Sequence, residues 1–303
     1  MKNRSSLRAL GALLLLLTLL LGACAQTAPG AQGTVTDGLG REVALGAVPQ
    51  KIVSLTPANT EILCALGLEE RLVAVDDYSN YPGAVAELEK IGAFNEPNIE
   101  RIAALKPDLI LAGDKLQKDA IDRLAQLGLT VAATEVSGVD AIPDSILLVG
   151  KLTGAESEAK ALADSFAARV SALRERYKGL GESERPTAYW ALSYGEFGDY
   201  TAGAGAFPTE MIEIAGGLSV SREMPVPWPM YSLEQLTLDD PDFIFLPIDP
   251  AFAADFVGLE PYASLTAVKE GRVVFIDPDA SSRPGPRLAD ALEAIAKALH
   301  PEG

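Results

Sequence analysis

Several aromatic side chains fall directly after predicted strands, where they could bind a large, partly apolar ligand without covalent chemistry. Tyr78 follows the strand predicted at 72–75, Phe94 lies in the loop 92–97, and Trp228 lies in the proline-rich loop 224–230. Loops beyond the carboxyl ends of parallel strands are where open α/β sheets bind ligands. Aromatic faces supply apolar contact area, and a few polar groups fix the orientation of the ligand. The pattern favours a binding cleft, although each ring could instead be part of a core.

Residues for covalent or metal-assisted catalysis are scarce in this sequence. The single histidine, His300, lies three residues from the C-terminus, and no Gly-x-Ser-x-Gly elbow occurs. Zinc enzymes and Ser-His-Asp hydrolases both need a positioned imidazole, so we expect no enzyme and no metal site. Of the two cysteines, we expect Cys64 to be a buried thiol without a disulfide partner.

The other cysteine follows a targeting segment. Basic residues precede the apolar run 10–21, which is too short to cross a membrane comfortably and ends in Leu21-Gly22-Ala23-Cys24. This end resembles a bacterial lipobox, in which the cysteine accepts a diacylglyceryl group. We therefore expect residues 1–23 to be removed, 24–45 to hold the lipidated Cys24 and a flexible tether, and the protein to work outside the cytoplasm on a membrane. A plain secretory signal with a chance cysteine is the alternative.

The charge of the chain excludes one class of partner. There are 25 Lys and Arg residues against 42 Asp and Glu residues, which gives a formal net charge of −17. Removal of the leader takes away basic residues only, so the mature chain is more acidic still. A nucleic-acid-binding protein needs a basic face, and we expect no nucleic-acid partner.

Matching segments recur in the same order in the two halves of the chain. Residues 99–112 and 233–246 each show a short helical pattern, then Pro-Asp, then an apolar strand. Residues 60–67 and 209–216 each show Thr as a candidate helix N-cap, Glu in the first turn and Gly at the end. Such punctuation is common, but two pairs in one order favour two lobes of related design.

The pattern of elements predicts the fold class. Strands alternate with helices, which indicates parallel sheets covered on both faces. Apolar residues recur at three- and four-residue steps over 156–178, which predicts one long amphipathic helix. We expect an α/β protein with two Rossmann-like lobes, 46–155 and 179–303, joined by this backbone helix. A rigid helical joint implies small opening motions between the lobes.

The motifs now described resemble those of a known family. In order they are the lipobox, the segments 54–61, 98–102 and 106–108, the long helix, and 210–217. This order is similar to the periplasmic binding proteins of the iron-siderophore, haem and cobalamin ABC importers, over roughly residues 48–300. The segments 56–61, 78–82 and 226–229 are most similar to those of the cobalamin-binding member.

The resemblance implies a monomeric binding protein without cofactor or enzymatic activity, which delivers its ligand to an ABC permease and its ATPase. In the family, one glutamate on each lobe docks against arginines of the permease. The matching positions are Glu61 on the first lobe and Glu210 on the second, with Glu213 as the alternative.

The resemblance also implies which residues bind the ligand and what that ligand is. The corrinoid cobalamin is favoured, although the cobalamin binder has Trp where this chain has Phe94, and lacks the Gly113-Asp114 and Ala280-Ser281 found here. A smaller corrinoid such as cobinamide is an alternative, as is a ferric siderophore or haem. A siderophore would need cationic residues, for which Arg222, Arg283 and Arg287 are the candidates. The expected ligand-binding residues are Ala58, Tyr78, Phe94, Trp228, Asp279 and Arg283.

Overall fold

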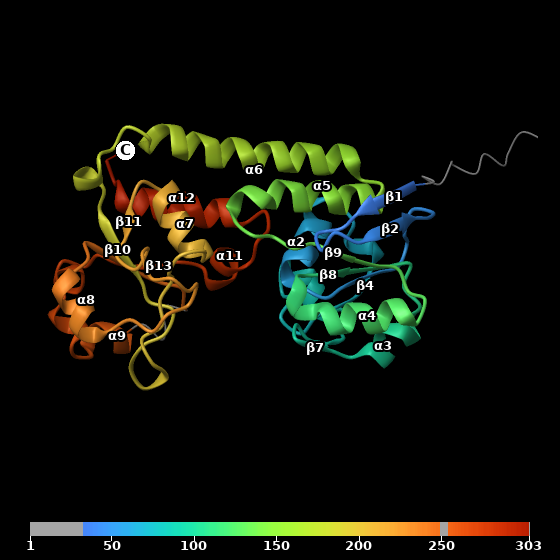
Figure 1. Ribbon diagram of the computed structural model, residues 1–303, viewed down its shortest axis with the longest axis horizontal. Coiled ribbons are helices and arrows are strands. Elements are labelled where there is room, and N and C mark those ends of the chain that lie inside the picture. Colours follow the sequence, from blue (N-terminus) through green and yellow to red (C-terminus); the bar gives the residue numbers. More distant parts are fainter. Residues whose placement is uncertain (1–32, 249–253, 303) are drawn as a thin grey trace, which may run out of the picture.

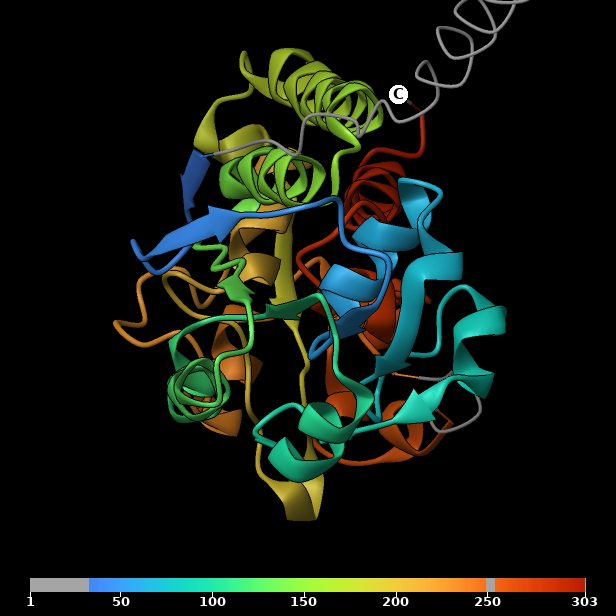
Figure 2. The ribbon, with the colours of Figure 1, turned by 90° about the vertical axis from the view of Figure 1, so that its right-hand side faces the viewer.

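Two lobes lie side by side, and one long helix runs along both of them (Figure 1). The computed structural model describes residues 33–248 and 254–302, so the leader and Cys24 lie outside the described residues. Each lobe has a central sheet with helices on both faces, as the end-on view of the first lobe illustrates (Figure 2). The predicted fold class, α/β with two lobes joined by a helix, is confirmed.

Both central sheets are fully parallel. The first has the strand order β5-β4-β3-β8-β9 and the second the order β11-β10-β12-β13. The strands of the first are β5 (Glu89–Lys90), β4 (Leu72–Val75), β3 (Ile52–Ser54), β8 (Leu109–Ala112) and β9 (Val131–Ala133). Those of the second are β11 (Leu218–Ser219), β10 (Thr187–Trp190), β12 (Phe243–Leu246) and β13 (Val273–Phe275). A short hairpin, β6 (Gly92–Ala93) and β7 (Glu96–Pro97), follows β5.

The helices divide between an inner face that lies toward the backbone helix and an outer face. The inner helices are α2 (Pro57–Ala65), α5 (Ile142–Thr153), α7 (Phe207–Ile214), α11 (Pro278–Ser282) and α12 (Leu288–Leu299). The outer helices are α3 (Ile99–Leu105), α4 (Lys118–Gln126), α8 (Leu233–Asp239), α9 (Ala254–Gly258) and α10 (Thr266–Lys269).

The repeated Pro-Asp segments have the same structural role in both lobes. Helices α3 and α8 each end in a residue with left-handed backbone, Lys106 at φ 49° and Asp240 at φ 37°. The carboxylate of Asp108 then accepts the Lys51 amide ahead of β3 at 2.9 Å, and that of Asp242 accepts the Thr187 amide of β10 at 2.8 Å. The same helix end and strand clamp therefore occur twice, which supports the repeat inferred from the sequence.

The predicted N-caps of α2 and α7 are wrong. Thr60 and Thr209 lie inside these helices, because Pro57 and Pro208 occupy the first turns and start each helix earlier. The cap of α2 is Thr56, whose hydroxyl accepts the Asn59 amide. Each helix is nevertheless followed by a glycine with positive φ, as expected.

The backbone helix α6 (Glu156–Tyr177) packs on both lobes. Its buried positions include Phe166, Val170 and Leu173, and they belong to one continuous inner core with residues of α2 and α5 on one side and α7 and α12 on the other. Arg169 of α6 also forms ion pairs with Asp290 and Glu293 of α12. The lobes thus share a core along the helix.

Part of the segment predicted as a flexible tether is structured. Residues 33–45 form an antiparallel hairpin, β1 (Gly33–Thr36) and β2 (Glu42–Leu45), with Val35 and Val43 buried. The fully buried Asp37 side chain accepts hydrogen bonds from Arg41 and from the Ala133 amide of β9. The hairpin therefore packs with the first lobe.

Candidate functional site

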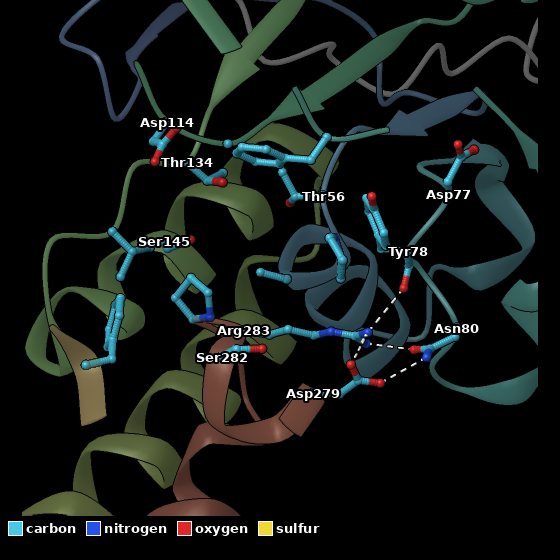
Figure 3. A pocket seen from close by; sticks show the side chains of 17 residues that line it. Thr56, Asp77, Tyr78, Asn80, Asp114, Thr134, Ser145, Asp279, Ser282 and Arg283 are labelled. Carbon is cyan, nitrogen blue, oxygen red and sulfur yellow. Dashed lines mark hydrogen bonds and ion pairs between the residues drawn. The ribbon is translucent and has the colours of Figure 1, made fainter. Parts of the chain in front are cut away.

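A pocket of about 680 Å³ lies between the lobes, at the carboxyl ends of β3, β4, β8 and β9 (Figure 3). The first lobe supplies most of its wall, through the loops after these strands and the start of α2, and the second lobe supplies α7 and α11. This is the place where open α/β sheets bind ligands. The lining residues are Thr56, Pro57, Ala58, Asp77, Tyr78, Asn80, Phe94, Gly113, Asp114, Thr134, Val136, Ser145, Phe207, Asp279, Ser282, Arg283 and Pro284.

Five of the six predicted ligand-binding residues line this pocket. Ala58, Tyr78, Phe94, Asp279 and Arg283 converge there, although 225 positions separate the first from the last. Trp228 is not among the lining residues. Its indole is 47% exposed, in a loop whose backbone is held by bonds from Thr201 to Pro229 and from Gly203 to Pro227.

A cross-lobe ion cluster closes one side of the pocket, and we call Glu61, Arg283 and Arg287 the interlobe clasp. Glu61 is 3% exposed, and its carboxylate accepts Nη1 of Arg283 at 2.9 Å and Nε and Nη2 of Arg287 at 2.9 and 2.7 Å. The hydrogen bond to Glu61 raises the pKa of Arg287. Both arginines belong to the second lobe and Glu61 to the first, so the clasp ties the lobes together.

Further polar contacts extend the clasp toward the pocket (Figure 3). Arg283 donates to Oδ1 of Asn80 at 2.8 Å and to the Tyr78 carbonyl at 3.1 Å, and Asn80 donates to Asp279 at 2.9 Å. The Arg287 guanidinium lies 4.1 Å from the ring centroid of Tyr81. The loop that carries Tyr78 is therefore held against the second lobe.

The buried carboxylate of Asp76 also holds the loop that carries Tyr78. Asp76 accepts hydrogen bonds from the Ser79 hydroxyl and, at 3.0 Å, from the Tyr78 amide. Burial raises the pKa of Asp76, and these bonds offset the effect only in part. The Ser79 hydroxyl also lies 2.8 Å from that of Thr60 in α2. This network positions Tyr78 at the pocket.

The three predicted docking glutamates have different surroundings. Glu61 is enclosed by the clasp, so its carboxylate is not presented at the surface of this conformation. Glu210 is half-buried and accepts the Val139 amide at 2.9 Å, with Arg174 at 3.6 Å. Glu213 is exposed. The prediction for Glu61 rested on the family resemblance, which gives no information on the contacts of this side chain with Arg283 and Arg287.

The sequence reasoning missed several polar residues of the pocket wall. Asp77, Asn80 and Thr134 follow β4 and β9, so the rule that pointed to Tyr78 could have found them. Ser145 of α5 and Phe207 at the start of α7 gave no such signal, because each belongs to a helix and not to a loop after a strand.

Within the part of the chain that the structure describes, no group of three His, Cys, Asp or Glu residues could hold a metal ion. Nor is any helix of residues 33–248 and 254–302 both long and apolar enough to cross a membrane.

Comparison with known proteins gives consistent matches over most of the chain. The model of a family described as periplasmic binding protein matches residues 52–280. The uncharacterized ABC transporter substrate-binding lipoprotein YvrC of Bacillus subtilis is 31% identical over 273 residues, which cover 89% of this chain and 86% of that protein. The vitamin B12-binding protein of Vibrio cholerae is 33% identical over 249 residues, which cover 81% of this chain and 87% of that protein.

Solved structures agree with the fold. A crystal structure of the periplasmic vitamin B12-binding protein of Vibrio cholerae matches with a TM-score of 0.72 at 32% identity, over 83% of this chain and 97% of that one. The periplasmic heme-binding protein RhuT of Roseiflexus sp. RS-1 matches with a TM-score of 0.75 at 24% identity, over 83% and 98%. The second likeness concerns the fold alone.

Proposed function

Because this chain belongs to the periplasmic binding protein family, as the substrate-binding component of an ABC importer, we propose that it captures a corrinoid between its lobes and delivers it to the permease. The observation that carries the proposal is the interlobe pocket, in which Ala58, Tyr78 and Phe94 supply an apolar wall and Asp279 and Arg283 a polar one. The likeness to vitamin B12-binding proteins supports cobalamin or a related corrinoid as the ligand.

Calorimetric titration of the mature chain with cyanocobalamin and cobinamide tests this proposal. We expect one-to-one binding that is weakened by Tyr78→Ala, because Tyr78 lines the pocket with an exposed ring. Leu127→Ala is the matched control, since Leu127 is also exposed but lies at the end of α4, outside the pocket lining. Absence of binding to both corrinoids, with binding of a ferric siderophore or haem, would transfer the proposal to those ligands.

Docking to the permease through ion pairs calls for exposed carboxylates on both lobes, and Glu61 is only 3% exposed in this conformation. Glu213 meets the requirement on the second lobe. The internal repeat offers a second pair, Glu100 and Glu234, each exposed at the second position of α3 and α8. We propose this pair as the docking residues, because it is equivalent in the two lobes and lies on the outer helices (Figure 1). Paired Glu–Arg contacts would fix orientation as well as attraction.

Charge reversal separates docking from ligand binding. Glu100→Lys together with Glu234→Lys is expected to abolish uptake through the permease while leaving ligand affinity unchanged. Glu158→Lys, an exposed position of α6, is the control for the altered surface charge. Unimpaired uptake would reject this pair, and Glu213→Lys and Glu210→Lys would then test the alternatives.

Membrane attachment is proposed from the sequence alone, since Cys24 lies outside the described residues. The lipobox at 21–24 supports lipid anchoring outside the cytoplasm, and the relative in Bacillus subtilis is named a lipoprotein. Cys24→Ser is expected to abolish labelling with a radioactive fatty acid. Persistent labelling would refute the anchor. We also propose a monomer, which light scattering of the soluble mature chain tests.

A further inference from the structure

The wall of the interlobe pocket carries more negative than positive charge. Three carboxylates line it, those of Asp77, Asp114 and Asp279, against the single guanidinium of Arg283. No lysine is among the lining residues, and Arg222 and Arg287, the other cations considered from the sequence, are not among them either. The net negative charge of the wall therefore favours cationic ligands over anionic ones.

The one cation of the wall is already neutralised by the protein. Arg283 lies 2.9 Å from Glu61 and 2.7 Å from Asp279, and it also donates to Asn80 and to the Tyr78 carbonyl. An anionic ligand would have to compete for this guanidinium with two carboxylates, that of the buried Glu61 and that of Asp279, whose side chain is 37% exposed. Displacing Glu61 would break a buried pair, which is strongly unfavourable.

Two of the carboxylates lack a compensating cation. Asp77 accepts only the Gly92 amide at 3.2 Å and Asp114 only the Leu116 amide at 2.9 Å, with no ion pair to either among the residues described. Each lies on the first lobe, after β4 and β8. A cationic ligand that fills the pocket would be attracted by each of these carboxylates.

An independent feature of the pocket concerns neutral polar groups. Ser145 lines the pocket and is 5% exposed, and its hydroxyl has no hydrogen-bond partner among the residues that the structure describes. A buried hydroxyl is costly to leave unpaired. A hydrogen-bonding group of the ligand, such as a carboxamide, would satisfy it.

We propose that the pocket selects a corrinoid with net positive charge and neutral amide side chains, one that lacks the phosphodiester-linked nucleotide. In a complete cobalamin the phosphodiester cancels one positive charge of the cobalt–corrin centre, whereas its removal leaves that charge free to interact with Asp77 and Asp114. The carboxylates of haem and the anionic groups of ferric catecholates are disfavoured by the same wall. This inference rests on the proposed function and specifies its ligand.

Calorimetry with two probes of different charge tests the selection. Aquacyanocobinamide carries one positive charge and cyanocobalamin is neutral, and both have the corrin amides. At low salt we expect the mature chain to bind the cationic probe about tenfold more tightly, as a charge interaction of about 1.4 kcal/mol implies. Higher salt is expected to reduce the difference in affinity between the two probes, because exposed charges are screened.

Variants assign the effect to named residues. Asp77→Asn with Asp114→Asn is expected to remove most of the preference, whereas Glu158→Gln on α6, outside the pocket lining, should leave it unchanged. Ser145→Ala should weaken both probes equally, by about fivefold, because both carry the amides. If Ser145→Ala left both affinities unchanged, or changed them unequally, the proposed hydrogen bond between Ser145 and a ligand amide would be refuted.

The outcomes distinguish this inference from the proposed function. Equal affinity for the two probes, unaffected by salt or by the aspartate variants, would overturn the charge selection and leave a corrinoid-binding protein. Failure of both corrinoids to bind, with or without binding of haem or a ferric catecholate, would overturn both proposals.

Discussion

We expect the substitution Glu61→Gln in the interlobe clasp to lower the free energy of unfolding substantially. Glu61→Gln keeps the shape of the side chain but removes the charge that accepts three hydrogen bonds from Arg283 and Arg287. Removal of one partner from a buried ion pair typically costs about 3–5 kcal/mol. We expect the lower end, about 3 kcal/mol, because Arg283 retains Asp279 and Arg287 retains Asp277.

Urea unfolding of the mature chain measures this cost. Glu293→Gln is the matched control, because Glu293 also binds an arginine through two oxygens but is 49% exposed. Exposed pairs contribute at most about 1 kcal/mol. A loss for Glu61→Gln no larger than that for Glu293→Gln would refute the reasoning.

A double-mutant cycle tests the pairing itself. The combined variant Glu61→Gln with Arg287→Gln is expected to lose less than the sum of the two single losses, by about 1–3 kcal/mol, because the second change removes a partner already lost. Additive losses would mean that the two side chains do not interact across the lobes.

Three further predictions concern other parts of the molecule. Gly113→Ala is expected to weaken ligand binding and to lower stability as well, because its Cβ would lie 2.9 Å from Cγ2 of Thr56, the cap of α2, and 3.1 Å from the Phe94 ring; calorimetry measures the affinity and urea unfolding the stability. Burial acts to raise the pKa of Asp37, but hydrogen bonds from Arg41 and the Ala133 amide outweigh it and the pKa is lowered. The resulting stabilisation is present above about pH 4 and is lost as the pH falls through the lowered pKa, so unfolding of Asp37→Asn should depend less on pH between about 2 and 5. Burial raises the pKa of the Cys64 thiol to about 11, so a disulfide reagent at pH 8 should modify it slowly in the native protein and rapidly in urea; fast native labelling would contradict this.

Local patterns in the sequence were enough to predict the repeated architecture and two aromatic residues of the pocket, whereas Ala58, Asp279 and Arg283 were predicted from the family resemblance. The apolar runs at 72–75 and 109–112 form strands over those same residues, and the sheet rule placed Tyr78 at the pocket. The errors arose where distant residues decide the outcome. The partners of Glu61 are 222 and 226 positions away, so nothing near it in the chain indicated its burial.

The starts of helices and the hairpin at 33–45 show a second kind of error. Thr60 was predicted as a cap because it precedes a helical pattern, but Pro57 already fixes the first turn and Thr56 is the cap. The hairpin at 33–45 was missed because the segment was grouped with the small, polar residues that precede it, although Val35 and Val43 flank an Asp37-Gly38 pair that is typical of hairpin turns. It is stabilised by Asp37 binding to β9, a contact between residues 96 positions apart.

The shared core beneath α6 limits how the chain could be divided or exchanged. Phe166 and Val170 are buried in one cluster with side chains of both lobes, such as Ile146 of α5 and Leu292 of α12. A chain cut on either side of α6 would leave one fragment without the helix and with an apolar surface in contact with water. The two halves repeat the same order of elements, yet neither would be expected to fold as an independent domain. In a hybrid that takes one lobe from a relative, the apolar residues of that lobe would have to pack against those of the other lobe along α6.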